Sequence, residues 1–122
     1  MRVSIFVELK EIDIPDGWLE WRLPVLPRTG EVFDGALLAR AFDPSKVYSR
    51  LSDSLVARWD GHRNELRDKV CSDKIERICL SRLFIESAWL ELEEIVWRYS
   101  DELGEYPELL FREREILHDS NS

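Results

Sequence analysis

The chain of 122 residues lacks the short motifs by which many enzymes are recognised. It has no HExxH metal motif, no phosphate-binding loop and no serine flanked by the glycines of a nucleophile elbow. His62 and Glu65 could share a helix face, but no third or fourth metal ligand accompanies them. We therefore predict no metal and no cofactor, and we favour a protein without catalytic activity.

Long apolar runs are also absent, and cysteine is scarce. No stretch of about 18 apolar residues occurs, so we predict no membrane span. The N-terminus becomes acidic at Glu8, which does not fit a signal peptide. The two cysteines, Cys71 and Cys79, are too few for a disulfide framework and indicate reduced thiols. These features predict a cytoplasmic protein, and the length predicts a single domain, 1–122.

Positive charge is scarce in one part of the chain. Residues 86–108 hold eight acidic residues against Arg98 alone, whereas residues 40–82 hold ten basic residues against seven acidic ones. The acidic segment therefore accounts for most of the net charge of −8. Such a surface argues against a nucleic-acid ligand and suits a basic protein partner, or the basic section of a second copy. The alternative is a solvated face that keeps the protein soluble.

The first quarter of the chain has the alternation of β-strands. Apolar residues recur at every second position over 2–14 and again over 18–23. The sequence Pro-Asp-Gly at 15–17 is a turn signal, so we predict an antiparallel β-hairpin. A short third strand is expected at 31–33, which would place all the predicted strands within 2–33.

Segment 26–32, Leu-Pro-Arg-Thr-Gly-Glu-Val, resembles a turn that is common in small bacterial β-containing proteins, where proline and glycine reverse the chain between two strands. As a whole, the short, acidic and motif-free chain resembles in type the orphan proteins encoded on bacterial mobile integron gene cassettes. That resemblance implies a soluble protein and, because several of those proteins form oligomers, an oligomeric one.

The second half of the chain is dominated by one stretch, 73–103, which we predict to be a single helix about 45 Å long. Asp73 could cap its start, and Gly104 could take the left-handed position after its last turn. Positions spaced alternately three and four apart form its first stripe, which is apolar except for one arginine: Ile75, Ile78, Arg82, Ile85, Trp89, Leu92, Val96, Tyr99 and Leu103.

Shorter helices are expected before the long one. We predict them at 35–42, at 44–59 with Asp43 as the N-cap, and at about 62–71. A strand hairpin is the alternative at 44–59, because that segment also holds residues that suit strands.

After the long helix, a further helix is favoured at 108–117, with a strand as the alternative and a frayed polar tail at 118–122. The predicted class is therefore α+β. An N-terminal antiparallel β-hairpin or small sheet would pack against a long C-terminal helix, with shorter helices completing a helical region at about 35–117.

A second apolar stripe on the predicted helix would need a cover of its own. With the neighbouring acids it predicts an interface for a homodimer or a protein partner, formed by Leu83, Leu90, Trp97, Glu86, Glu93 and Glu94. The alternative is that the chain's own shorter helices bury this stripe. The leading hypothesis is a non-catalytic protein-interaction module that acts through the long acidic helix.

Tryptophan is abundant, with five residues in the chain. A pocket between the hairpin and the long helix would be lined by Trp18, Trp21, Trp59 and Trp89, with Arg82 as its charged group. The second hypothesis is therefore a small-molecule-binding protein or an enzyme. A third is an immunity or antitoxin-type neutraliser, whose acidic helix would cover a basic toxin surface.

Overall fold

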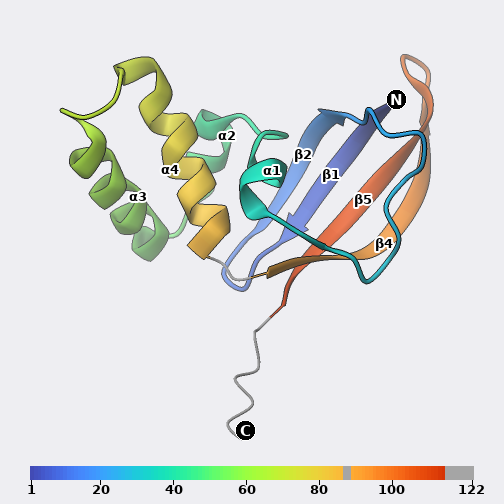
Figure 1. Ribbon diagram of the computed structural model, residues 1–122, viewed down its shortest axis with the longest axis horizontal. Coiled ribbons are helices and arrows are strands. Elements are labelled where there is room, and N and C mark those ends of the chain that lie inside the picture. The colour runs from blue at the N-terminus through green and yellow to red at the C-terminus, as the bar shows by residue number, and fades with distance from the viewer. Residues whose placement is uncertain (87–88, 115–122) are drawn as a thin grey trace, which may run out of the picture.

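The computed structural model describes residues 1–86 and 89–114. Within these residues, five strands form one mixed sheet, and four short helices lie between the third and fourth strands in the sequence. The helices gather at one end of the molecule, and the β4–β5 hairpin extends away from them (Figure 1). In chain order the elements are β1 (Arg2–Glu8), β2 (Asp13–Glu20), β3 (Val32–Phe33), α1 (Gly35–Ala39), α2 (Pro44–Tyr48), α3 (Asp53–Leu66), α4 (Ser72–Glu86), β4 (Trp89–Ser100) and β5 (Gly104–Arg114).

The sheet is mixed because β1 has one antiparallel and one parallel neighbour. The strand order is β2-β1-β5-β4-β3, in which only the β1–β5 pair is parallel. Side chains alternate between the two faces of the sheet, and we call the more deeply buried face the inner face. It supplies these core residues: Val3, Ile5, Val7, Ile14, Leu90, Leu92, Leu109 and Phe111.

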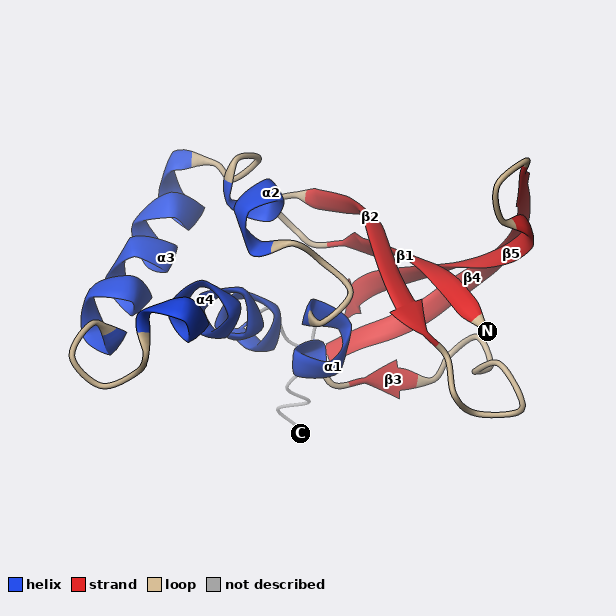
Figure 2. Cartoon of the chain, turned by 90° about the horizontal axis from the view of Figure 1, so that it is seen from above, coloured by secondary structure: helices blue, strands red, loops and turns tan. Residues whose placement is uncertain are grey.

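The helices add to this core, with α1 and α4 closest to the sheet (Figure 2). Leu38 of α1 and Leu80 and Phe84 of α4 are buried in the same apolar cluster as the strand residues. Gly35, at the start of α1, lies directly against the backbone of Phe84, where a side chain has no room. Seen from above, α1 lies beside the sheet and α3 lies on the far side of α4 (Figure 2). No helix in the described part of the chain has both the length and the apolar character needed to cross a membrane.

The prediction of one long helix over 73–103 is wrong. The longest described helix, α4, has 15 residues and ends at Glu86, and the 12-residue strand β4 follows from Trp89. Strands therefore lie at both ends of the described chain, and the predicted packing of a hairpin on a long C-terminal helix is not the fold. Gly104 does have a positive φ of 69°, but it lies where the β4–β5 turn leads into β5.

A β-bulge explains why this strand resembled a helix in the sequence. The pairing of β4 with β5 shifts between Leu92 and Glu94, so that Glu93 is an extra residue. Leu92 and the next residue on the inner face, Ile95, are therefore three positions apart, a spacing typical of a helix. The β-branched and aromatic residues at 95–99 favoured the strand that is present.

The segment 44–59 is neither a single helix nor a hairpin. Helix α2 ends at Tyr48 and α3 begins at Asp53. The expected N-cap is confirmed, because the Asp43 carboxylate accepts a hydrogen bond from the Ser45 backbone N–H at 3.0 Å.

The favoured helix at 108–117 is also wrong as far as the structure describes it. Strand β5 continues to Arg114, with Leu109 and Phe111 buried at alternate positions. The last residues of that prediction and the predicted tail fall within 115–122, outside the described residues.

The N-terminal strands β1 and β2 are antiparallel, but their turn lies earlier than expected. The Leu9 backbone N–H bonds to the Ile12 carbonyl at 2.9 Å, and the Pro-Asp-Gly segment 15–17 lies inside β2. Asp16 has a positive φ of 64°, and the β1–β2 register shifts beside it. The turn signal therefore marks a bulge in a strand, where one residue takes a left-handed conformation.

Candidate functional site

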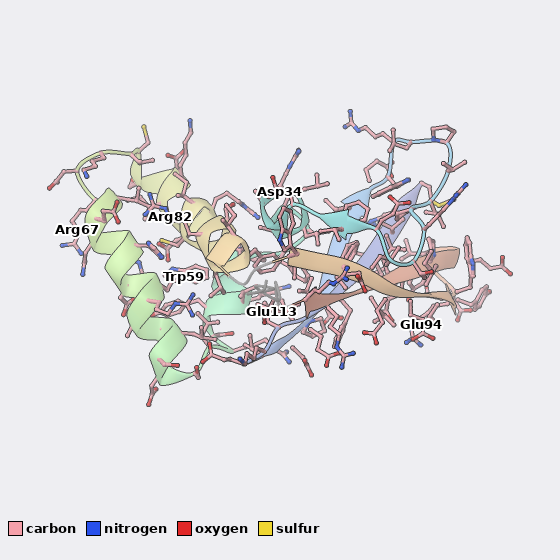
Figure 3. All side chains as sticks on the ribbon, turned by 60° about the horizontal axis from the view of Figure 1, so that its bottom comes forward. Asp34, Trp59, Arg67, Arg82, Glu94 and Glu113 are labelled. Carbon is pink, nitrogen blue, oxygen red and sulfur yellow. The ribbon has the colours of Figure 1, made fainter. Side chains whose placement is uncertain are left out.

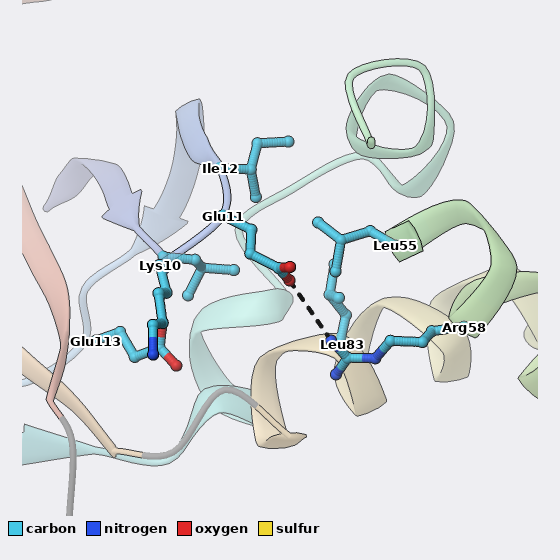
Figure 4. A pocket seen from close by; sticks show the side chains of 8 residues that line it. Lys10, Glu11, Ile12, Leu55, Arg58, Leu83 and Glu113 are labelled. Atoms are coloured by element: carbon cyan, nitrogen blue, oxygen red, sulfur yellow. Dashed lines mark hydrogen bonds and ion pairs between the residues drawn. The ribbon is translucent and has the colours of Figure 1, made fainter. Parts of the chain in front are cut away.

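One hollow lies between the β1–β2 turn and helices α3 and α4 (Figure 4). Its volume of about 180 Å³ is below the roughly 300–1,000 Å³ typical of ligand pockets. Its acids already have partners: Glu11 lies 3.7 Å from the Arg58 guanidinium, and Glu113 accepts a hydrogen bond from the Lys10 backbone N–H at 2.6 Å. Among the residues described, no group of three His, Cys, Asp or Glu side chains could hold a metal ion. We therefore do not place a site here.

The four tryptophans expected to line one pocket lie in different places. Trp59 of α3 is only 1% exposed, whereas Trp89 at the start of β4 is 51% exposed. Trp18 lines an open groove of about 430 Å³ beside α2, and Trp21 lines a separate groove of similar volume beside α1. The structure does not bring these residues together around one cavity.

Arg82, the charged residue expected in that pocket, joins two helices instead. It lies on α4, where its Nη1 is 3.2 Å from the Glu65 carboxylate of α3 and 3.1 Å from His62 Nδ1. Figure 3 places Trp59 and Arg82 together at the helical end of the molecule, away from Glu94 on the hairpin. Arg82 thus serves the packing of α3 on α4.

A second polar cluster also joins these helices. Arg63 of α3 donates hydrogen bonds to both carboxylate oxygens of Glu76 on α4, and the Trp59 Nε1 donates to the same carboxylate at 3.3 Å. The hydrogen bond from Arg63 lowers the pKa of Glu76, and the same contact raises the pKa of Arg63. The Arg63 guanidinium also lies 5.0 Å from the centre of the Tyr48 ring. Every charged group here has a partner, so the cluster is a structural clamp.

The two cysteines should differ sharply in reactivity. Cys71 is exposed before α4, whereas Cys79 is buried within α4, where burial raises the pKa of its thiol. A thiol-specific dye at neutral pH should therefore label one thiol per folded chain and both after denaturation. Replacing Cys71 with serine should abolish the rapid reaction of the folded protein. Rapid labelling of the Cys71→Ser variant would show instead that Cys79 is accessible.

Two of the apolar residues assigned to an interface lie inside the chain's own core. Leu83 of α4 is 3% exposed, and Leu90 of β4 is fully buried. The side chain of Glu86, at the end of α4, lies outside the described residues. The remaining three, Trp97, Glu93 and Glu94, all lie on β4.

Trp97 and Glu94 belong to a part of β4 that lacks a strand on one side. Strand β3 pairs with only two residues of β4, and residues 30–31 add hydrogen bonds to Leu92. Beyond that point, residues 94–100 pair with β5 on one side and, within the described chain, with no backbone on the other. We call the unpaired side of residues 94–100 the open edge.

The hydrogen bonds of Leu92 show which backbone groups point out of the open edge. Both its N–H and its C=O bond to residues 30–31, away from β5. In an antiparallel ladder, residue pairs that exchange hydrogen bonds alternate with pairs that do not. Leu92 and Phe111 form a pair without such bonds, and the next pair, after the bulge, joins Glu94 to Leu110. Glu94 therefore bonds towards β5, and the N–H and C=O groups of Ile95, Trp97 and Tyr99 point outward.

Aromatic side chains flank these outward groups. Ile95 and Trp97 lie on the inner face of the sheet, because they pair with Leu109 and Pro107 of β5 and paired residues share a face. Tyr99 is two residues further along β4 and lies on the same face. Trp97 is 57% exposed and Tyr99 is 70% exposed, because the helices do not reach this end of the sheet. An edge with unpaired backbone and uncovered aromatic rings is a template to which another strand can add.

The acidic segment is partly neutralised on the opposite face of the sheet. Arginines pair with its glutamates across β4 and β5 in three contacts: Arg98–Glu108 at 2.8 Å, Arg112–Glu93 at 3.3 Å and Arg114–Glu91 at 2.7 Å. Four acids near the open edge and the hairpin turn have no ion pair in the part of the chain that the structure describes: Glu94, Asp101, Glu102 and Glu105. The surplus of negative charge thus lies at the far end of the hairpin.

Comparison with protein-family models, with curated proteins and with solved structures finds no match to this chain. The resemblance to proteins encoded on integron cassettes stays a prediction. Sequence reasoning selected Trp97 and Glu94 but missed the open edge itself. Strand propensity at 95–99 was a signal for the strand, but nothing local shows that β3 is only two residues long and leaves this edge unpaired.

Proposed function

We propose that this chain is a non-catalytic protein-interaction module that binds by strand addition at the open edge of β4. One observation carries the proposal: among the described residues, 94–100 have no neighbouring strand on one side, and they expose two aromatic rings there. Strand addition derives affinity from main-chain hydrogen bonds and specificity from alternate side chains. The open edge supplies outward backbone groups at Ile95, Trp97 and Tyr99 for these main-chain hydrogen bonds. Its aromatic rings supply the side-chain contacts that give specificity.

The opposite edge of the sheet does not offer the same opportunity. On β2, the Trp18 backbone N–H already bonds to the Ala41 carbonyl at 2.8 Å, before α2. Strand β2 also contains Pro15, which has no backbone N–H to donate to a further strand. Soluble proteins usually protect a long edge strand with lysine, proline or a covering element. Residues 94–100 contain neither lysine nor proline, and their charged residues, Glu94 and Arg98, lie on the face opposite to the exposed rings.

Site-specific photocrosslinking in cells that produce the protein would test this proposal. A photoreactive phenylalanine analogue replaces Trp97 in one variant and Trp89 in a control variant. Both tryptophans lie on β4 with similar exposure, 57% and 51%, but only Trp97 lies on the open edge. We expect protein adducts at position 97 and few at position 89. Equal labelling at both positions, or none at either, would contradict strand addition at this edge.

A further inference from the structure

We infer that the open edge pairs with the open edge of a second copy of this chain, antiparallel about a two-fold axis at Trp97. This inference rests on the proposed function, because it requires strand addition at β4. The two sheets would join into one continuous sheet across the axis. Trp97 would lie opposite Trp97 of the second copy, Ile95 opposite Tyr99, and Val96 opposite Arg98.

The backbone pattern fits this register. The residues whose N–H and C=O groups point outward are Ile95, Trp97 and Tyr99, which are placed symmetrically about Trp97. In the antiparallel two-fold arrangement, outward residues face only outward residues, so each of the three pairs exchanges two hydrogen bonds. A register displaced by one residue would set an outward residue opposite one already bonded to β5.

The inner-face side chains also complement themselves. Ile95 would lie beside Tyr99 of the second copy, and the two Trp97 rings would meet at the axis. Aromatic and β-branched residues are among the favourable cross-strand pairs. Pairing would cover the rings of Trp97 and Tyr99, now 57% and 70% exposed, without uncovering any other apolar group.

Two ion pairs across the axis would offset part of the negative charge that the two edges bring together. On the other face, Arg98, which already pairs with Glu108 of its own chain at 2.8 Å, would lie diagonally across the axis from Glu94 of the second copy, within reach of a long side chain. Glu94 has no ion pair in the described part of the chain, and the axis would create this contact twice. A strand from another protein would have to provide a carboxylate, a cation and inner-face rings at the same spacing. The open edge already has all three.

The paired segment would begin and end where the open edge does, at Glu94 and Ser100. Ser100 of the second copy would face Glu94, the last position before the turn at residues 28–30. Beyond Ser100 the hairpin turns back towards β5, away from the partner.

Disulfide trapping tests the register directly. All variants carry Cys71→Ser, because Cys71 is exposed and would react by itself. Val96→Cys in one chain and Arg98→Cys in another would place two Cα atoms about 4.5 Å apart, within disulfide range. The same residue in two identical chains would be separated by about 8 Å, beyond that range. Mild oxidation of purified chains should therefore give a reducible dimer from the mixture of both variants and little from either variant alone.

Measurement of the molecular mass at equilibrium is the second test of this inference. Sedimentation equilibrium should show a monomer–dimer equilibrium for the unmodified chain. Trp97→Lys should raise the dissociation constant at least about tenfold, as expected for a central aromatic residue, whereas the matched control Trp89→Lys should leave it nearly unchanged. Far-ultraviolet circular dichroism of both variants would confirm that the fold is retained.

Each contrary result has a distinct meaning. A monomer at all concentrations, or crosslinking of each variant with itself instead of with the other, would overturn this inference. If the purified chain is monomeric but position 97 still crosslinks to a different protein in cells, strand addition stands and the second copy is the wrong occupant. If both experiments are negative, the proposed function itself fails.

Discussion

Replacing Gly35 with alanine is expected to lower the free energy of unfolding by about 2 kcal/mol or more, as overpacking of a close contact does. A Cβ at this position would lie 2.8 Å from both the carbonyl carbon and the oxygen of Phe84. These are backbone atoms of α4, so relief requires a shift of α1 against α4 and not a change of rotamer. Phe84 is fully buried and its ring packs against Phe42, so such a shift would disturb the centre of the core.

Gly61 provides a matched control with the opposite expected sign. It lies in the interior of α3, where a Cβ would meet no atom within 4 Å. Gly61→Ala should therefore raise the free energy of unfolding by about 1 kcal/mol, because alanine restricts the unfolded chain and favours the helix. Urea denaturation at low protein concentration would measure both variants, with the slope checked for constancy. If Gly35→Ala were as stable as Gly61→Ala, the close approach of α1 to α4 would be wrong.

Local chemistry was enough to predict some elements of this fold. Strict alternation at the N-terminus predicts a strand, and β1 is present at Arg2–Glu8. The Asp-Pro pair at 43–44 predicts a helix start, and α2 begins there with Asp43 as its cap. In both segments the signal depends only on neighbouring residues, and it agrees with the tertiary structure.

The prediction failed where a strand was interrupted by one extra residue. The bulge at Glu93 changed the spacing of inner-face residues from two to three, and apolar residues of α4 continued the same apparent helical stripe. The sequence around 87–88 contains neither glycine nor proline, so nothing marked the end of the helix. Strand propensity at 95–99 opposed the helix and agrees with the strand that is present.

The candidate site depended on tertiary facts that the sequence does not carry. Trp59 and Trp97 are the same residue type, yet one is 1% exposed and the other 57%. The difference arises because Trp59 packs against α4, whereas the helices do not reach the end of the sheet that holds Trp97 (Figure 1). Burial and strand neighbours of this kind can be known only from the assembled sheet.

Replacing Glu76 with glutamine should destabilise the protein at neutral pH by about 1 kcal/mol, the usual scale for charge-assisted hydrogen bonds near a surface. Glu76 accepts hydrogen bonds from Arg63 and from the Trp59 ring nitrogen, and the variant would leave the half-buried Arg63 guanidinium with Asp60 as its remaining carboxylate partner. The value stays modest because the side chains of Arg63 and Glu76 are 32% and 42% exposed and solvent screens their attraction. Glu105→Gln is a suitable control, because it removes one exposed carboxylate that has no ion pair in the described chain.

The pH dependence of this loss separates the ion pair from simple packing. The hydrogen bond from Arg63 lowers the pKa of Glu76 in the folded chain below its ordinary value of 4.5. A carboxyl group whose pKa is lower when folded than when unfolded contributes stability above the unfolded value and loses it as the pH falls through the folded value. The difference in unfolding free energy between the unmodified chain and Glu76→Gln should therefore be constant near neutrality and shrink below about pH 4.5. Urea titrations from pH 7 to pH 3 would measure it. A difference that stayed constant down to pH 3 would show that the glutamine costs packing alone and that the Arg63–Glu76 pair does not stabilise the contact of α3 with α4.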